Sequence, residues 1–467
     1  MTTNLKTGIG DKSRSSGGVT QRLLRGFGAM ATGPVVTAGI QLVTVPLLLH
    51  AWGAAKYGDW LLLSAIPSYL TLSDLGFGDA SGSDMSMKVA AGDRDGAVET
   101  FQSSWVLVTG VSLAALLMAL VSVWWIPWQR WLKLSSVSGL QAATIMLVLA
   151  AYVVAAQQNG VTESGYRCGG QFATGTFWAT MLRLIEVSAA TAVAVFGGSL
   201  LAVALTYLAV RIPGSLAYAW LLRRKSPWIH FGVRRAKLTT VKRLAAPAFG
   251  FVAFPLGTAL SLQGMTILIG SLLGPLAVVT FSVLRTLSRL NVQLFGVITN
   301  ALWPELSRAF GAGNISLARR LHRHAWQASL GLSLCGGVVM WVLGPWIFNF
   351  WVRQNVTFNA NCFHVLLLVA VSSMLWSASS VILISINDHW RIAAVYVGAT
   401  ALSLLLARLL IPELGITGGA LALLVTEGAM TGLALHTALR HVQDSLKKFL
   451  PAIIAIQRFS LQGAPEP

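Results

Sequence analysis

Apolar runs recur along almost the whole sequence, and they constrain the fold more than any other feature. Each run is near the roughly 20 residues that a helix needs to cross the hydrocarbon core of a bilayer. Only 11% of the residues are charged and the mean hydropathy is +0.68, whereas a soluble domain carries roughly a quarter of charged residues. We therefore expect an all-α polytopic membrane protein, because helices satisfy their own backbone polar groups in lipid.

Twelve spanning helices are predicted in two halves. The N-terminal six-helix half covers residues 27–222 and the C-terminal half covers residues 243–440, and a basic linker, residues 223–242, joins them. Basic tails, residues 1–26 and 441–467, flank the halves. The predicted spans are residues 27–50, 57–80, 101–126, 139–160, 174–197, 199–222, 243–271, 275–303, 325–350, 362–386, 391–411 and 417–439.

The positive charges indicate the orientation of these spans. If the N-terminus is cytoplasmic, the outer loops hold only four of the 34 Lys and Arg residues, namely Lys56, Arg130, Lys133 and Arg353. This bias predicts a multi-pass protein of the cell inner (plasma) membrane with both termini in the cytoplasm. The net charge of +18 is then a basic face toward anionic membrane lipids, and no nucleic-acid partner is expected. The linker is expected to anchor to the inner leaflet, with a specific lipid-phosphate site as the alternative.

Two short segments suggest an internal repeat. Ala90-Ala91-Gly92-Asp93 follows the second predicted span, and Gly311-Ala312-Gly313-Asn314 follows the eighth. Gly58 and Gly274 begin the spans that precede them. With six spans in each half, the copies have the same orientation and form a parallel repeat around a central cavity. Transporters of this kind commonly bind their substrate between the halves.

Polar side chains follow one face of the eighth span. They recur at helical spacings and include Ser282, Arg285, Arg289, Gln293 and Asn300. Two arginines near the bilayer centre cost at least about 2.5 kcal/mol each, so they should face protein or water. We predict a cationic cavity wall that binds an anionic substrate through these five residues, because the planar guanidinium suits phosphate. The alternative is that the arginines pair with acidic residues and lock helices together.

Two acidic residues inside spans are candidates for a gate or for coupling. Asp74 lies on a polar face of the second span, at a depth compatible with an ion pair to Arg289. Such a pair would form a gate that the substrate breaks. Glu427 lies inside the last span without an obvious partner, so it is a candidate proton carrier, and a structural hydrogen bond is an equal alternative.

The remaining charged and metal-binding residue types give weaker signals. Arg183 and Glu186 stand three residues apart and are expected to neutralise each other. Asp79 and Asp84 are expected at the inner surface and receive no role. The three cysteines and eight histidines form no metal-ligand spacing, so neither a metal nor a cofactor is expected.

The N-terminal half resembles the polysaccharide transporter (O-antigen flippase-like) family of the multidrug/oligosaccharidyl-lipid/polysaccharide exporter superfamily. The residues that carry the resemblance are Pro46-Leu47-Leu48-Leu49, Gly53, Tyr57-Gly58-Asp59-Trp60, Asp74-Leu75-Gly76-Phe77-Gly78 and Ala90-Ala91-Gly92-Asp93. The C-terminal half matches this family only in its general plan of six helices.

The resemblance implies a non-enzymatic flippase. Its substrate would be an undecaprenyl-pyrophosphate-linked oligosaccharide, moved to the outer leaflet by alternating access for surface or exopolysaccharide biosynthesis. A polysaccharide polymerase or ligase would receive the product. One alternative is a cation-coupled multidrug or small-molecule exporter of the same superfamily, although two cavity arginines should repel cationic drugs. A membrane glycosyltransferase or sugar ligase is less favoured, because the predicted outer loops are short and nearly free of carboxylates.

Overall fold

The computed structural model describes residues 17–352, 356–386, 388 and 390–454, and for some of them, including residues 17–35, the backbone only. The regular elements in this part of the chain are all helical, which confirms the predicted all-α class. The first half contains α1 (Gly17–Ser68), η2 (Tyr69–Asp74), α2 (Phe77–Ala90), α3 (Arg94–Ser122), α4 (Trp128–Trp131), α5 (Gly139–Cys168), α6 (Phe172–Val195) and α7 (Leu200–Lys225).

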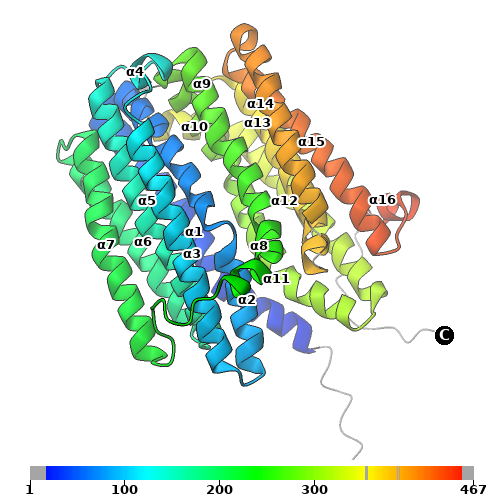
Figure 1. The fold of residues 1–467 in the computed structure, drawn as a ribbon. Coiled ribbons are helices and arrows are strands. Elements are labelled where there is room, and N and C mark those ends of the chain that lie inside the picture. Colours follow the sequence, from blue (N-terminus) through cyan, green and yellow to red (C-terminus); the bar gives the residue numbers. More distant parts are fainter. Residues whose placement is uncertain (1–16, 353–355, 387, 389, 455–467) are drawn as a thin grey trace, which may run out of the picture.

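The second half contains the remaining helices. They are α8 (Leu238–Ala259), the π-helical η3 (Leu260–Gly264), α9 (Met265–Leu273), α10 (Pro275–Ser288), α11 (Leu290–Gly311), α12 (Ile315–Val352), α13 (Ala360–Ser385), α14 (Trp390–Leu414), α15 (Ile416–His441) and α16 (Leu446–Ile454). Figure 1 shows α3, α5, α6 and α7 on one side of the central helices α1 and α8, and α12 to α15 on the other side.

The number of membrane-spanning helices agrees with the sequence. Within the residues that the structure describes, ten helices are long and apolar enough to cross a membrane. One of them, Val36–Ala90, holds two predicted spans because the backbone turns at Gly53 (φ 72°, ψ 168°). The eighth predicted span is divided between α10 and α11. The prediction of about twelve transmembrane helices is therefore confirmed.

The backbone reveals the internal repeat more clearly than the side chains do. Gly274 begins α10 with φ 90° and ψ 178°, which is nearly the conformation of Gly53. Gly53 and Gly92 are 39 residues apart, and so are Gly274 and Gly313, all four with positive φ. The sequence suggested Gly58 as the counterpart of Gly274, but the structure shows that it is Gly53. Glycine takes this positive-φ conformation easily because it has no Cβ.

The two loops that close these repeats have the same hydrogen bonds. The amide of Asp93 donates to the Lys88 carbonyl, five residues back, and the amide of Asn314 donates to the Ala309 carbonyl in the same way. The Asp93 side chain then accepts from the Gly96 amide, three residues ahead, and the Asn314 side chain accepts from the Leu317 amide. Each loop therefore ends one helix with a left-handed glycine and caps the next.

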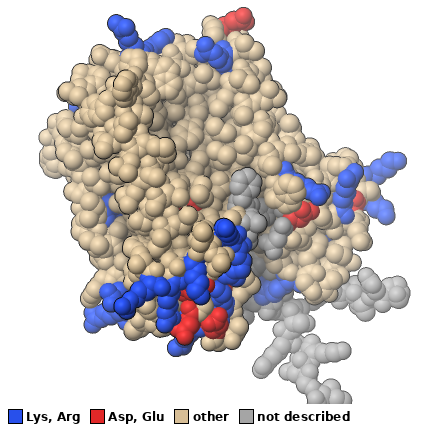
Figure 2. Space-filling view, viewed as in Figure 1, with Lys and Arg blue, Asp and Glu red and all other residues tan. Residues whose placement is uncertain are grey.

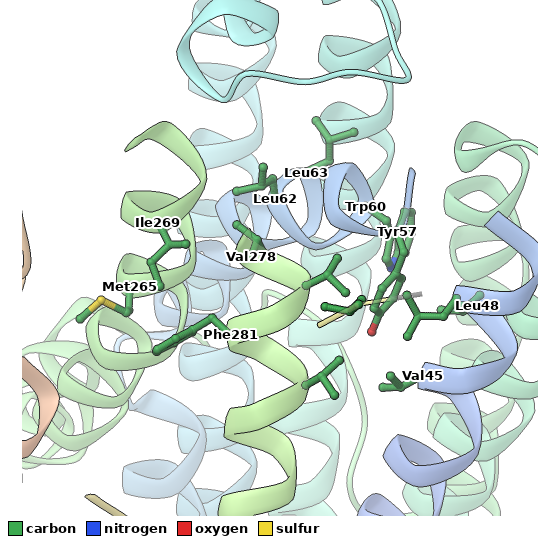
Figure 3. Packing of buried hydrophobic residues seen from close by; sticks show 14 of the residues in the cluster. Val45, Leu48, Tyr57, Trp60, Leu62, Leu63, Met265, Ile269, Val278 and Phe281 are labelled. Atoms are coloured by element: carbon green, nitrogen blue, oxygen red, sulfur yellow. The ribbon is translucent and has the colours of Figure 1, made fainter. Parts of the chain in front are cut away.

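One core joins central helices of the two halves at one end of the bundle. We call this the far end; it carries Gly53, α4 and Gly274. There one cluster joins side chains of α1, α9 and α10, and Figure 3 shows Leu62 beside Ile269 and Val278. At Gly58 an added Cβ would collide with the Pro275 carbonyl, so the two backbones are in direct contact.

The opposite end, which we call the basic end, has two separate cores. It carries the junctions at Gly92 and Gly313 and the linker between α7 and α8. One core lies among α2, α3, α5 and α7 with the first turns of α8, and another lies among α11, α12, α13, α15 and α16. Figure 2 shows many of the Lys and Arg side chains at this end, with a broad uncharged band above them. At the basic end the first turns of α8 thus pack into the core of the first half, while α11, α12, α13, α15 and α16 have a core of their own.

Candidate functional site

The second span is interrupted in its middle. The helix stops at Ser68, continues as the 3-10 turn Tyr69–Asp74, and restarts at Phe77 after Gly76 in a left-handed conformation. Interrupted backbone inside a membrane needs partners for its freed polar groups. Gln157 of α5 supplies them, because its side-chain amide donates to the carbonyls of Leu70 (3.0 Å) and Thr71 (2.9 Å).

Asp74 lies at the end of this interruption and serves the backbone. Its Oδ1 accepts a hydrogen bond from the Gly76 amide at 2.9 Å, next to the first turn of α2. Within the described part of the chain it forms no ion pair with Arg285 or Arg289. The proposed gate between Asp74 and Arg289 is therefore not formed in this conformation, and it stays a prediction.

The eighth span departs from regular α-helix at the corresponding depth, but at a single residue, and the backbone hydrogen bonds from Arg289 to Arg285 and from Gln293 to Arg289 are kept. α10 ends at Ser288 and α11 begins at Leu290, with Arg289 between them at φ −90° and ψ −1°. No turn like that of residues 69–76 is inserted here. The two halves thus depart from regular α-helix in equivalent helices, but they place different side chains there, an acid in the first and a base in the second.

Arg285 is held by its own half. Its Nη1 donates to the Leu262 carbonyl at 3.0 Å and its Nη2 donates to the Thr266 hydroxyl at 3.2 Å. Leu262 belongs to the π-helical turn between α8 and α9, where the regular backbone hydrogen bonds are shifted. The guanidinium also lies over the Phe281 ring at 5.3 Å. In this conformation Arg285 therefore braces the π-helical turn.

Arg289 is free of such bonds within the described structure and faces a different acid. It is partly exposed, and it lies within Coulombic reach of Glu427 and of Tyr396. Glu427 in α15 is 3% exposed and accepts a hydrogen bond from the indole N–H of Trp376. The acid that the structure brings toward Arg289 is thus Glu427.

Aromatic rings surround Glu427. The Trp376 ring lies 5.2 Å from Tyr396 and 6.2 Å from Phe254, measured between centroids. These side chains come from α13, α14 and α8, so the surroundings of Glu427 combine consecutive helices with one that lies more than 100 residues earlier in the sequence. We name Arg289, Glu427, Trp376 and Tyr396 the C-half site.

The other predicted substrate-binding residues have different surroundings. Gln293 donates to the side-chain carbonyl of Gln41 in α1 at 3.0 Å, and its own Oε1 is buried with no partner in the described structure. Ser282 is partly buried on α10. Asn300 lies in α11, and its side chain is outside the described residues. The Gln41–Gln293 contact joins the two halves beside Arg289.

The predicted pair of Arg183 and Glu186 is wrong. Glu186 is fully buried, and its Oε2 accepts from the Arg211 guanidinium and from the Tyr152 hydroxyl. Arg211 also donates to the Tyr152 oxygen at 3.0 Å. Arg183 lies one turn from Glu186 on the same helix, but the packing of α7 and α5 against α6 brings Arg211 closer.

Asp84 also differs from the prediction. It is 7% exposed instead of lying at the surface, and both of its oxygens accept from Arg243, at 2.8 and 3.0 Å. Lys88 and the Thr100 hydroxyl bind the same carboxylate. Asp79 is exposed as predicted, and it pairs with Arg167 at 3.3 Å.

Sequence reasoning missed several residues that complete this region. They are Gln41, Tyr69, Gln157, Trp376 and Tyr396. Gln41 and Gln157 had a usable signal, since each is an amide inside an apolar run. The aromatic residues had none, because Trp and Tyr are frequent throughout membrane helices. No group of three or more His, Cys, Asp or Glu side chains that could hold a metal occurs in the described residues.

The fold defines the class of protein. An inward-facing multidrug resistance MATE family transporter of the MOP superfamily is 14% identical, with a TM-score of 0.73, and the match covers 90% of this chain and 99% of that one. A MOP superfamily transporter from Pyrococcus furiosus is 12% identical, with a TM-score of 0.66, over 93% and 99% of the two chains. A mutant MATE transporter from Vibrio cholerae is 18% identical, with a TM-score of 0.64, over 93% and 99%. The chain therefore has the fold of a MOP superfamily transporter.

The family follows from the sequence itself. The model of the family described as polysaccharide biosynthesis protein matches residues 23–310, more than half of the 467 residues. The chain belongs to this family, and the resemblance of its N-terminal half is confirmed. Among curated proteins, none matches the sequence. It is a multi-pass membrane protein, and its structural neighbours are transporters rather than enzymes.

Proposed function

We propose that the protein is a flippase for an undecaprenyl-pyrophosphate-linked oligosaccharide in surface or exopolysaccharide biosynthesis. Membership of the polysaccharide biosynthesis family supports a glycan as part of the substrate, and the transporter fold supports movement of that substrate across the membrane. The protein would work in the inner membrane with both termini in the cytoplasm, so that the basic end faces inward. A polymerase or ligase on the outer side would take the product.

The observation that carries this proposal is the state of Arg289. It is a cation at the junction of α10 and α11, partly exposed and without an ion pair within the described structure. A charge at this depth is costly unless it meets a partner or water. A diphosphate offers several anionic oxygens that match the planar guanidinium fork. Gln293, Ser282 and Asn300 would add polar contacts along the same face, and Arg285 would join after leaving the Leu262 carbonyl.

The packing of the two halves supports alternating access. They share a core at the far end, whereas at the basic end only the first turns of α8 enter the core of the first half and the other second-half helices pack in a separate core. This is the arrangement expected of a state that receives its substrate from the cytoplasm. Glu427 would couple transport to a cation, because binding of the diphosphate to Arg289 would remove the positive charge that faces this carboxylate.

The test is glycan display in cells that carry Arg289→Ala, with the amount of protein measured. We expect display to fall at least tenfold, and Arg289→Lys to restore part of it, because a lysine keeps the charge but lacks the fork. Arg408→Ala is the matched control, since Arg408 is an exposed arginine within another span, α14. Normal display with Arg289→Ala would overturn the assignment of Arg289.

A second candidate function is cation-coupled export of small molecules. The aromatic rings around Glu427 favour it, because Trp and Tyr faces attract organic cations. Efflux of cationic dyes by purified protein in vesicles, lost in Glu427→Gln and kept in Arg289→Ala, would support this candidate over the flippase. Loss of glycan display in Arg289→Ala without any dye efflux would exclude it.

A further inference from the structure

A groove opens on the first half, away from the second half. It has a volume of about 560 Å³ and is lined by α3, α5 and α7. Its rim includes Leu113, Ile212 and Leu216, which are exposed. Exposed apolar side chains on a spanning helix face lipid, and α7 packs mainly on α5 and α6 within its own half. The groove therefore opens to the bilayer and is separate from the C-half site.

The linker closes the groove at the basic end. Phe231 of the linker lines the groove together with Trp105 of α3, and the two rings meet edge to face at 5.7 Å. Gln102 fixes the linker there, because its side chain donates to the His230 carbonyl and accepts from the Arg235 amide. The position of the linker across the mouth is thus defined by hydrogen bonds.

Cations lie beside this mouth. On α7, Leu216 and Ala219 line the groove, and Arg223 follows them on the same helical face at spacings of seven and four. Lys225 ends the helix, and Arg234 stands three residues beyond Phe231. All three side chains are exposed.

Three other cations of the linker region are already neutralised, and Arg224 lies over the Trp220 ring. Arg235 pairs with Asp95, Lys237 with Glu99 and Arg243 with Asp84. Arg223, Lys225 and Arg234, in contrast, have no carboxylate partner within the described part of the chain. The first half thus presents three uncompensated positive charges at the mouth of an apolar groove that opens to lipid.

We infer that this groove and its three cations bind one anionic phospholipid of the inner leaflet, with an acyl chain in the groove and the phosphate at Arg223, Lys225 and Arg234. The apolar walls match the chain and the cations match the headgroup. Each such cation adds about fivefold to the affinity for an anionic membrane lipid. This site is independent of the proposed cargo, because the lipid would stay bound to the first half while the halves move.

Native mass spectrometry of the full-length protein with equal amounts of phosphatidylglycerol and phosphatidylcholine tests the inference. We expect one retained phosphatidylglycerol, with a preference of at least fivefold. The triple variant Arg223→Gln/Lys225→Gln/Arg234→Gln should bind both lipids equally. Ala219→Phe, which fills the groove and keeps the charges, should retain neither. Ala219→Leu is a milder version if the phenylalanine is not tolerated.

The matched control removes three exposed cations from the basic end of the second half, as Arg440→Gln/Lys447→Gln/Lys448→Gln. This variant should keep the preference of the unchanged protein. An equal loss in this control would mean nonspecific attraction, and would overturn the site. The site would also be overturned if Arg223→Gln/Lys225→Gln/Arg234→Gln kept the preference for phosphatidylglycerol, or if Ala219→Phe and Ala219→Leu both kept the bound lipid. Retention of undecaprenyl phosphate in its place would overturn the assignment to a phospholipid.

Discussion

Glu186 of the first half and Glu427 of the second half are both buried inside spanning helices, and their partners differ. Glu186 of the first half is 0% exposed and has a direct ion pair with Arg211, supported by Tyr152. Glu427 of the second half is 3% exposed, accepts from the Trp376 indole and faces Arg289 only through Coulombic interaction. A buried charge is tolerated when it is paired and hydrogen-bonded.

This difference in partners distinguishes a charge that stabilises the fold from one that can take part in transport. The ion pair of Glu186 is closed, because only 11% of the side chain of its cation, Arg211, is exposed and this cation belongs to a helix of the same half. Arg289 is partly exposed and lies at the junction of α10 and α11 beside the contact between the halves. A cation that can leave its acid for a substrate is useful for transport, whereas one that cannot leave stabilises the fold. The following predictions test this distinction.

The largest effect is expected from Arg211→Met. It leaves Glu186 buried without its cation, and it should lower the free energy of unfolding by about 3–5 kcal/mol. Denaturant unfolding in detergent measures this change. The double variant Arg211→Met/Glu186→Leu should recover most of the loss, since no charge is left unpaired. A double variant as unstable as the single one would show that Arg211 acts through packing alone.

Trp376→Phe should have a smaller effect. It removes the N–H donor to Glu427 but keeps a ring beside Phe254 and Tyr396, so about 1.5–3 kcal/mol of unfolding free energy should be lost. Trp125→Phe, at a side chain 83% exposed, is the control and should be nearly neutral. If both variants lose the same amount, the indole hydrogen bond contributes nothing to holding Glu427.

Glu427→Gln should change stability by about 1 kcal/mol or less, because the amide oxygen still accepts from Trp376. Its transport should no longer respond to an imposed proton or sodium gradient. Glu186→Gln is the informative comparison, since it should weaken the fold while the response to the gradient persists. Transport is measured in vesicles under a proton or a sodium gradient, for Glu427→Gln and for Glu186→Gln. A gradient response that survives in Glu427→Gln would remove this residue from coupling.

The smallest effect on stability is expected from Asp74→Asn. Asparagine keeps an oxygen for the Gly76 amide, so unfolding should change by less than about 0.5 kcal/mol, whereas Asp74→Ala should lose about 1 kcal/mol. If Asp74 also serves as a gate in another conformation, glycan display should fall in both variants. Normal display in Asp74→Asn would limit Asp74 to its backbone role.

The polar faces of the second and eighth spans illustrate how far the sequence could reach. Their helical spacing placed Asp74 and Arg289 inside spanning segments, but it did not predict the 3-10 turn at Tyr69–Asp74, which breaks the polar face of the second span. The surrounding side chains were not predictable, because they come from α1, α5, α8, α13, α14 and α15. The predicted pair of Arg183 and Glu186 failed for the same reason: spacing along one helix describes only the neighbours on that helix.

By itself, the sequence determined the number of spanning helices, the all-α class and the family. Apolar length fixes the spans because lipid leaves the backbone no other partners. Only the tertiary structure decided which charges are paired, that Arg285 braces the π-helical turn, and that Arg289 faces Glu427. Burial and partner choice depend on the packing between helices, and that packing is set by side chains hundreds of residues apart, such as Gln41 and Gln293.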